Sequence, residues 1–368
     1  MSSVLVVNPG SSSLRVSLVD VDGEHVEDTA HVEHPPDSAE ANDALDGFLD
    51  RVDTSGLVAV GHRLVHGGAE LRTPTVVDDG VVDAVWRVKT LAPLHVPATL
   101  QLLDLLREKV PDVPHVLCPD TAFHAELPEA AYTYPLPRQW REKFGLRRFG
   151  FHGLSYAWAL GRAAELLGRP REELNVVLAH LGGGSSVCAV RDGRSVDTSM
   201  GFTPLEGTPM AKRSGSIDPG LLVWLIREGG LAVSEVEDGL YHRSGLLGLS
   251  NGRSDDTREL VAVRDTDPAA DLALRVFDHR VRREIAAAAT SLDRVDALVF
   301  TGEIGWDQPE VREDICAGLG TLGIAGGLAG NRDDDGPISP PSARIPILVV
   351  EPREDLQLCR DTMTALAS

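Results

Sequence analysis

One pattern occurs twice in this chain, once near the start and once in the second half. Residues 4–23 read as an aliphatic strand, a Gly/Ser tip, a second strand and an Asp-Gly turn, and residues 176–193 repeat this order. Such a tip gathers backbone N–H groups and small hydroxyls around one point, which suits a phosphate. One tip alone fits an ordinary turn equally well. Two similar hairpins favour a duplicated α/β domain with phosphates in the cleft between the copies.

A third glycine loop follows a buried strand late in the chain. It lies in the stretch LVFTGEIGWD at residues 298–307, and a helix is predicted to begin at Pro309. Chance alone could produce one such loop. Two similar hairpins and a third glycine loop are harder to explain by chance. The three loops together therefore indicate nucleotide phosphates as the ligand.

Length and composition limit the class of protein. A chain of 368 residues is long enough for two domains, and its net charge of −21 argues against a non-specific binder of nucleic acid or of anionic membranes. Neither a secretory signal pattern nor a stretch of membrane-span length is present, so we expect a cytoplasmic protein. The cysteines are scattered and predict free thiols in a reducing compartment. They are Cys118, Cys188, Cys316 and Cys359.

Charged residues that suit phosphoryl transfer follow several predicted strands and loops. This chemistry needs in-line positioning of donor and acceptor, and positive charge or hydrogen-bond donors on the phosphoryl oxygens. Asp120, just past a strand, is as often a turn former or an N-cap. Arg213 is either a surface charge or a cleft residue, and the serine and glycine around it, which keep the backbone adaptable, favour the cleft. Taken together, these side chains and the loops predict a two-domain phosphotransferase with Mg²⁺ held by acids. The candidates are Arg63, Arg213, His152, His180, Asp120 and Glu354.

Eight motifs together resemble the acetate kinase family, which includes propionate kinases. They are VNPGSSSLR, GHRLVHGG, LAPLHVP, DTAFH, FGFHGLS, AHLGGGSS, DTSMGFTPLEG and RSGSIDP, in the family's order and nearly from end to end. The resemblance implies a duplicated actin-like (ribonuclease H-like) α/β fold with an active-site cleft between two domains, 1–124 plus 355–368 and 125–354. It also implies a homodimer that transfers phosphate reversibly from ATP to acetate or propionate, giving an acyl phosphate and ADP, with Mg²⁺ or Mn²⁺.

The resemblance also implies roles for individual positions. The catalytic residues are Asp120, His152 and Arg213. The carboxylate of the substrate is bound by Arg63, and its alkyl group by Val65, Leu94, Phe151 and Pro204. The nucleotide and its phosphates are bound by Ser11, Ser13, Arg15, His180, Gly182, Gly183, Gly184, Asp256, Thr257, Arg258, Glu303, Ile304, Gly305 and Asp307. The metal is held by Asn8 and Glu354.

The sequence departs from the family pattern where the nucleoside would bind. Thr257 stands where an aromatic residue is usual, and Glu303 where a glycine leaves room for the nucleoside. Three hypotheses follow. The first is an ATP-dependent acetate or propionate kinase, with Trp306 stacking on the base. The second is the same chemistry with another nucleotide, pyrophosphate or a different small carboxylate. The third is a ligand-binding homologue without turnover, which the retained arginines, His152 and Asp120 disfavour. No nucleic-acid or membrane partner is expected.

Overall fold

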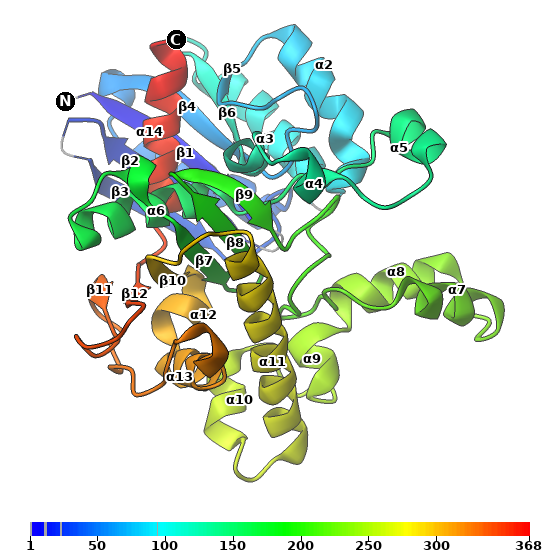
Figure 1. Cartoon of the computed structure of the whole chain (residues 1–368). Coiled ribbons are helices and arrows are strands. Elements are labelled where there is room, and N and C mark those ends of the chain that lie inside the picture. Colours follow the sequence, from blue (N-terminus) through cyan, green and yellow to red (C-terminus); the bar gives the residue numbers. More distant parts are fainter. Residues whose placement is uncertain (1, 11–12, 23, 94) are drawn as a thin grey trace. The chain divides into compact units, whose positions relative to one another are not determined.

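The computed structural model describes residues 2–10, 13–22, 24–93 and 95–368, which divide into two compact units (Figure 1). The first unit comprises Met1–Ala125, Phe151–Trp158 and Arg353–Ser368, and the second comprises Glu126–Gly150 and Ala159–Pro352. The predicted division assigned all of 125–354 to the second domain. Phe151–Trp158, which carries His152, instead groups with the first unit.

The first unit is built on a six-stranded mixed sheet with the order β3-β2-β1-β4-β6-β5. β1 pairs antiparallel with β2 and parallel with β4, which in turn runs parallel to β6. The strands are β1 (Ser3–Pro9), β2 (Leu14–Asp20), β3 (His25–Val32), β4 (Leu57–Leu64), β5 (Thr75–Val76) and β6 (His115–Pro119). Strand β3 follows a hairpin that the sequence predicts only as far as Asp22-Gly23, and it was not expected.

The second unit contains a six-stranded sheet with the order β11-β12-β10-β7-β8-β9. Here β7 pairs antiparallel with β8 and parallel with β10, and β10 runs parallel to β12. The strands are β7 (Val176–Leu181), β8 (Ser185–Arg191), β9 (Arg194–Thr198), β10 (Ala297–Thr301), β11 (Gly336–Pro337) and β12 (Ile347–Val349). The two sheets share one connectivity, in which a three-stranded meander is followed by two parallel strands. The predicted duplication is therefore present in the fold.

Helices cover both sheets. In the first unit they are α1 (Ala39–Arg51), α2 (Asp79–Val88), α3 (Val96–Lys109) and α14 (Glu354–Leu366), and α6 (Gly153–Leu167) begins there and continues into the second. The second unit adds α4 (Glu129–Tyr132), α5 (Arg138–Phe144), α7 (Pro219–Arg227), α8 (Val233–His242), α9 (Gly245–Leu249), α10 (Thr257–Val263), α11 (Pro268–Thr290), α12 (Gly302–Asp307) and α13 (Pro309–Ala317).

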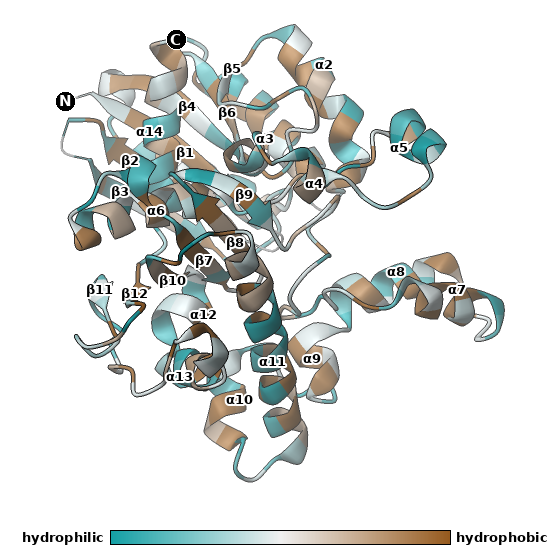
Figure 2. Cartoon of the chain, viewed as in Figure 1, coloured by the Kyte–Doolittle hydropathy of each residue, from teal (hydrophilic) through white to brown (hydrophobic). Residues whose placement is uncertain are grey.

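Each unit has its own hydrophobic core between sheet and helices. In the first, Leu45 and Phe48 of α1 and Leu102 of α3 pack on the β1–β2 hairpin. In the second, the long helix α11 packs Phe277 and Val281 on the sheet, whose strands β7, β8 and β10 are strongly hydrophobic (Figure 2). Apolar residues on one face of a helix at this spacing are the usual reason for such packing. Among the described residues, no helix combines the length and apolar character that crossing a bilayer requires.

Candidate active site

A buried ion pair in the first unit brings together two of the predicted site residues. Arg63 Nη2 donates to Asp120 Oδ2 at 2.7 Å, and Arg63 Nε lies 3.2 Å from both carboxylate oxygens. Arg63 Nη1 donates to Asn8 Oδ1 at 3.0 Å, and Asn8 Nδ2 donates to Glu354 Oε2 at 2.8 Å. Four predicted residues, two for the reaction and substrate and two for the metal, therefore form one connected cluster.

The parallel strands of the first sheet explain why these residues meet. Arg63 lies near the end of β4 and pairs in register with Cys118 of β6, so Asp120 follows directly on the neighbouring strand. Asn8 lies at the end of β1, on the other side of β4. The carboxyl ends of parallel strands are the usual location of ligand sites in α/β sheets. Glu354 begins α14, which packs so closely on β4 that a Cβ at Gly61 would lie 2.2 Å from Thr362 Oγ1.

Burial and charge oppose each other in this cluster. The Asp120 side chain is 1% exposed and the Arg63 side chain 13%. Burial raises the pKa of the Asp120 carboxyl, and the charge of Arg63 counteracts this rise. Burial alone would lower the pKa of Arg63, but the carboxylates of Asp120 and Glu354 outweigh it and raise that pKa. The guanidinium is therefore held permanently charged and in a fixed orientation.

His152 is held beside the ion pair by an uncommon backbone conformation. Its φ is +59°, in the left-handed region, and its backbone N–H donates to the Asp120 carboxylate. A Cβ at the next residue, Gly153, would lie 2.0 Å from the Asp120 carbonyl oxygen, so only glycine fits there. The imidazole ring of His152 contacts Tyr156 edge to face, with centroids 6.5 Å apart. Non-glycine residues in this conformation cluster at functional sites, where the surrounding structure holds them.

The oxygen atoms around Arg63 fit a hard divalent cation. In the described part of the chain, no three His, Cys, Asp or Glu side chains gather as a metal-binding group. Mg²⁺ usually takes only one or two protein carboxylates, however, and completes its shell with water and phosphate oxygens. The Asn8 amide and the Glu354 carboxylate, joined at 2.8 Å, offer ligands of this type. The donor set therefore fits Mg²⁺ or Mn²⁺.

The first glycine loop and the predicted alkyl pocket are described only in part. Ser11 and Leu94 lie outside the described residues. Gly10 N–H donates to Ser13 O at 2.8 Å and closes the tip between β1 and β2, while Arg15 is exposed on β2. The remaining apolar candidates are buried: Val65 and Phe151 in the first unit, Pro204 in the second.

In the second unit, the other two glycine loops adjoin each other. His180 lies next to the last residue of β7, and Gly182, Gly183 and Gly184 form the tip before β8. Gly302 begins α12 with φ +79°, and a Cβ there would lie 2.5 Å from Leu181 O. A Cβ at Gly182 would lie 3.6 Å from the backbone nitrogen of Glu303. The two predicted phosphate loops therefore lie directly against one another.

Arg213 lies in a loop that packs against α9. Its Nη1 donates to Pro204 O at 3.2 Å, and Met210 N–H donates to Arg213 O at 3.1 Å. A Cβ at Gly245, which has φ +61°, would lie 2.1 Å from Met210 O. The neighbouring cation, Lys212, forms an ion pair with Asp255 at 3.2 Å. The charge of Lys212 is therefore paired at the surface.

Three residues that sequence reasoning missed hold the loop that carries Pro204. Arg148 Nη1 donates to the carbonyls of Thr198, Ser199 and Met200, and Arg148 Nη2 donates to Glu206 Oε1 at 2.8 Å. Tyr134 Oη donates to the other oxygen of Glu206 and accepts from the Phe202 N–H at 2.8 Å. Arg148 precedes the FGFHGLS motif by one residue, and Glu206 lies within DTSMGFTPLEG, so motif membership was the available signal.

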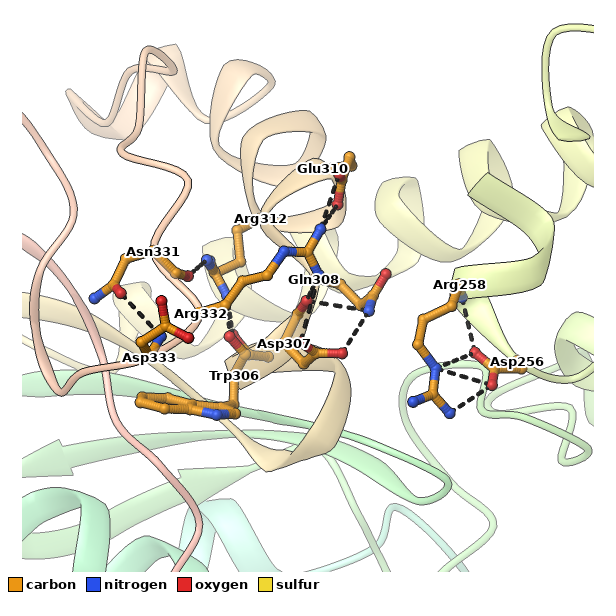
Figure 3. Close-up of polar contacts among 11 residues, drawn as sticks. Asp256, Arg258, Trp306, Asp307, Gln308, Glu310, Arg312, Asn331, Arg332 and Asp333 are labelled. Carbon is orange, nitrogen blue, oxygen red and sulfur yellow. Dashed lines mark hydrogen bonds and ion pairs between the residues drawn. The ribbon is translucent and has the colours of Figure 1, made fainter. Parts of the chain in front are cut away.

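The predicted nucleoside end brings α10 and α12 to the same region. Arg258 donates to both oxygens of Asp256, the N-cap of α10, and this contact raises the pKa of Arg258. The negative charges of Glu303 and Asp307 on α12 also raise the pKa of Arg258. Glu303 is exposed, whereas Ile304, Gly305 and Thr257 are buried. In Figure 3 the Trp306 indole lies on the side of α12 away from Arg258, and it packs on the core of the second unit.

Comparison with known proteins identifies the family. The model of the acetokinase family matches residues 26–360. The acetate kinase of Thermotoga maritima is 40% identical to this chain over an alignment of 392 residues, gaps included, which covers 98% of this chain and 97% of that protein. The acetate kinase of Deinococcus radiodurans is 42% identical over 386 residues, covering 97% and 96%.

Solved structures of acetate and propionate kinases share the fold of this chain. Porphyromonas gingivalis acetate kinase has a TM-score of 0.89 and 32% identity, with all of both chains covered. A propionate kinase from Francisella tularensis has a TM-score of 0.90 and 31% identity, covering 99% of this chain and 100% of that chain. The duplicated sheets and these matches confirm the predicted duplicated α/β fold, which acetate and propionate kinases share. The chain belongs to the acetokinase family.

Proposed function

We propose that the chain is a short-chain carboxylate kinase that transfers a phosphoryl group reversibly from ATP to acetate or propionate, giving an acyl phosphate and ADP. The observation that supports this most is the buried cluster of the first unit, in which Asp120 and Asn8 fix Arg63 and Glu354 lies beside it. A guanidinium held in one orientation is a preorganised receptor for a carboxylate or a phosphoryl group.

The acceptor end follows from the properties of Arg63. A guanidinium carries five N–H donors, more than its bonds to Asp120 and Asn8 require, so Arg63 would bind the substrate carboxylate. A small carboxylic acid, like Asp and Glu with pKa values of about 4, is already ionised at pH 7 and needs no base. The role proposed for Asp120 is therefore to orient Arg63, and Val65, Phe151 and Pro204 would contact the alkyl group.

The donor end follows from the loops of the second unit. Backbone N–H groups of the tip at His180–Gly184 would bind the phosphates of the nucleotide. The side chains of Arg213 and His152 would donate hydrogen bonds to the oxygens of the phosphoryl group during its transfer. Asp256, Arg258 and the start of α12 would contact the nucleoside. Asn8 and Glu354 would hold Mg²⁺ or Mn²⁺, which when bound neutralises charge on the transferring phosphates.

The test traps acyl phosphate with hydroxylamine and measures the hydroxamate. Acetate, propionate and butyrate are each combined with ATP, GTP and pyrophosphate. We expect turnover of acetate or propionate with ATP, and dependence on Mg²⁺ or Mn²⁺ that chelation removes. Turnover with pyrophosphate and none with ATP would refute the proposed donor. No turnover with any pair would refute the kinase assignment.

We infer further that the protein forms a homodimer through the second unit. Large hydrophobic side chains are exposed along α7 and the turn from α7 to α8. They are Leu221, Val223, Trp224, Ile226, Leu231 and Val233. Figure 2 shows α7 as a largely hydrophobic helix. Clustered exposed apolar surface of this kind marks an interaction site.

The matched variants for this inference are Trp224→Glu and Trp140→Glu. Trp224 is 56% exposed, and Trp140, on α5, is 54% exposed. We expect light scattering to find a dimer for the native chain and for Trp140→Glu, and a monomer for Trp224→Glu. A dimer that survives in Trp224→Glu would contradict the inferred contact.

A further inference from the structure

The largest fully buried side chain of the described residues belongs to an arginine. Arg312, on α13, has a relative exposure of 0%. Burying a cation is unfavourable unless it is well hydrogen-bonded, so the contacts of this side chain must compensate for its burial. Burial lowers the pKa of Arg312 to about 10, which leaves it charged at neutral pH.

The partners of Arg312 are backbone carbonyls from two separate segments. Its Nη1 donates to Gly305 O at 2.9 Å and to Trp306 O, and its Nη2 donates to Asn331 O (Figure 3). The Nε atom is buried and has no hydrogen-bond partner. The carboxylates of Asp307 and Glu310 stabilise the charge of Arg312 electrostatically, without a hydrogen bond to it. The side chain therefore serves carbonyl groups rather than a carboxylate.

The carbonyls of Gly305 and Trp306 lie in the last turn of α12, where a helix leaves its carbonyl groups without partners inside the helix. A cation at the carboxyl end of a helix also faces the negative end of its dipole. Outside this buried contact lies a second one: Arg332 donates to Asp307 O and, at 3.0 Å, to Glu310 Oε1. One buried and one exposed arginine thus tie the end of α12 to residues 331–332.

The start of α12 is fixed independently. Gly302 packs on Leu181, at the tip that carries His180–Gly184, and the next residue is Glu303. The position of Glu303–Asp307 relative to this tip therefore depends on two supports, the glycine at the first residue of α12 and Arg312 at its end. Releasing the second support would leave the phosphate tip intact and free the segment that faces Arg258.

We propose that Arg312, assisted by Arg332, is a positioning residue for the nucleoside end of the donor site. This rests on the proposed function, because it takes the segment at Glu303–Asp307 to contact the nucleoside of ATP or ADP. The guanidinium holds the Gly305 and Trp306 carbonyls to Asn331 and so fixes the position of α12, whose carboxylates interact with Arg258. It touches neither phosphate nor carboxylate substrate.

The test compares ADP with tripolyphosphate, a ligand that has phosphates and no nucleoside. Arg312→Lys keeps the charge but cannot span both carbonyl groups, so we expect the Kd for ADP to rise at least about tenfold. The Kd for tripolyphosphate and the KM for acetate should stay unchanged. A merely structural role would instead weaken all three together or lower only the melting temperature.

The matched control is Arg191→Lys. Arg191 lies in the second unit, donates to Ser291 O and, like Arg312, has a buried Nε without a partner. Its replacement should change neither Kd. An unchanged ADP affinity in folded Arg312→Lys, or equal weakening of ADP and tripolyphosphate, would overturn the proposal.

A variant on the surface keeps the test decisive if Arg312→Lys does not fold. Arg332 has a side chain 40% exposed, so Arg332→Ala leaves the core intact. It should raise the Kd for ADP severalfold and leave tripolyphosphate binding unchanged, and an unchanged Kd for ADP would then overturn the proposal. Failure of the proposed function would show separately, since the native chain would not bind ADP at all.

Discussion

Replacing Asp278 by asparagine should stabilise the protein, by an amount that depends on pH. Asp278 lies on α11, is 2% exposed, and its Oδ1 is buried without a hydrogen-bond partner. Burial raises the pKa of this carboxyl to about 8, and Asp314 on α13 adds to the rise. The charges of Arg282, on the same helix, and of Arg264, after α10, oppose the rise without overcoming it.

The size of the effect follows from the two pKa values. The unfolded chain releases this proton near pH 3.8, its ordinary value, whereas the folded chain retains it until about pH 8. Between these limits the native state binds one proton more, so its free energy of unfolding falls by about 1.4 kcal/mol for each pH unit of increase. At pH 7 the accumulated cost is about 4 kcal/mol. An asparagine side chain at this position titrates nowhere in this range and would not incur the cost.

Urea unfolding of both proteins at pH 4.5, 6, 7 and 8.5 measures this difference. The advantage of Asp278→Asn should be small at pH 4.5, widen with pH and level off above about pH 8. Hydrogen exchange of peptides from α11 and α13 would locate it. Asp271→Asn, on the same helix at a partly exposed ion pair with Arg275, is the control and should shift stability by less than about 1 kcal/mol. A constant difference across pH, or a loss that grows toward pH 8.5, would refute the reasoning, because the latter means an ionised and paired carboxylate.

Two further predictions concern the site. Arg63→Ala should lower kcat/KM for acetate about 10²-fold, because a preorganised donor to the acceptor is lost, while the Kd for ADP, measured by calorimetry, stays unchanged. Equal loss of both would contradict the assigned role. Glu206→Gln weakens the contacts with Arg148 and Tyr134 that hold the loop of Pro204, and should lower kcat about tenfold without changing the Kd for ADP. A kcat equal to that of the native chain would exclude this role for Glu206.

The architecture could be predicted where the signal is local. The alternating residues and Gly/Ser tips at 4–23 and 176–193 form hairpins as expected, because strand pattern and turn chemistry lie within one short stretch. Asp218 as N-cap and Pro219 at the first helical position begin α7, and this signal is also local. Strand β3 was missed because its residues, 25–32, are half exposed and carry charge, as edge strands commonly do.

The site was predictable by motif but not by contact. Arg63 and Asp120 each follow a strand pattern, yet their ion pair depends on β4 and β6 being neighbours, which no local feature encodes. Arg312 could have been found: it shares a helical face with Ile315 and Cys316, three and four residues on, and all three are buried. An arginine on an apolar face was the signal. That it serves carbonyls from residues 305, 306 and 331 was not encoded locally.

The order in which the chain is synthesised gives the contact between Asn8 and Glu354 a further meaning. Asn8 leaves the ribosome before its partner, which follows 346 positions later on a helix that packs against the first sheet. The second unit is translated in full before that helix emerges. The unit that begins first is therefore completed last, after slow closure of a very long loop. A nascent or prematurely ended chain can bury much of its core, but it cannot assemble the charged cluster around Arg63.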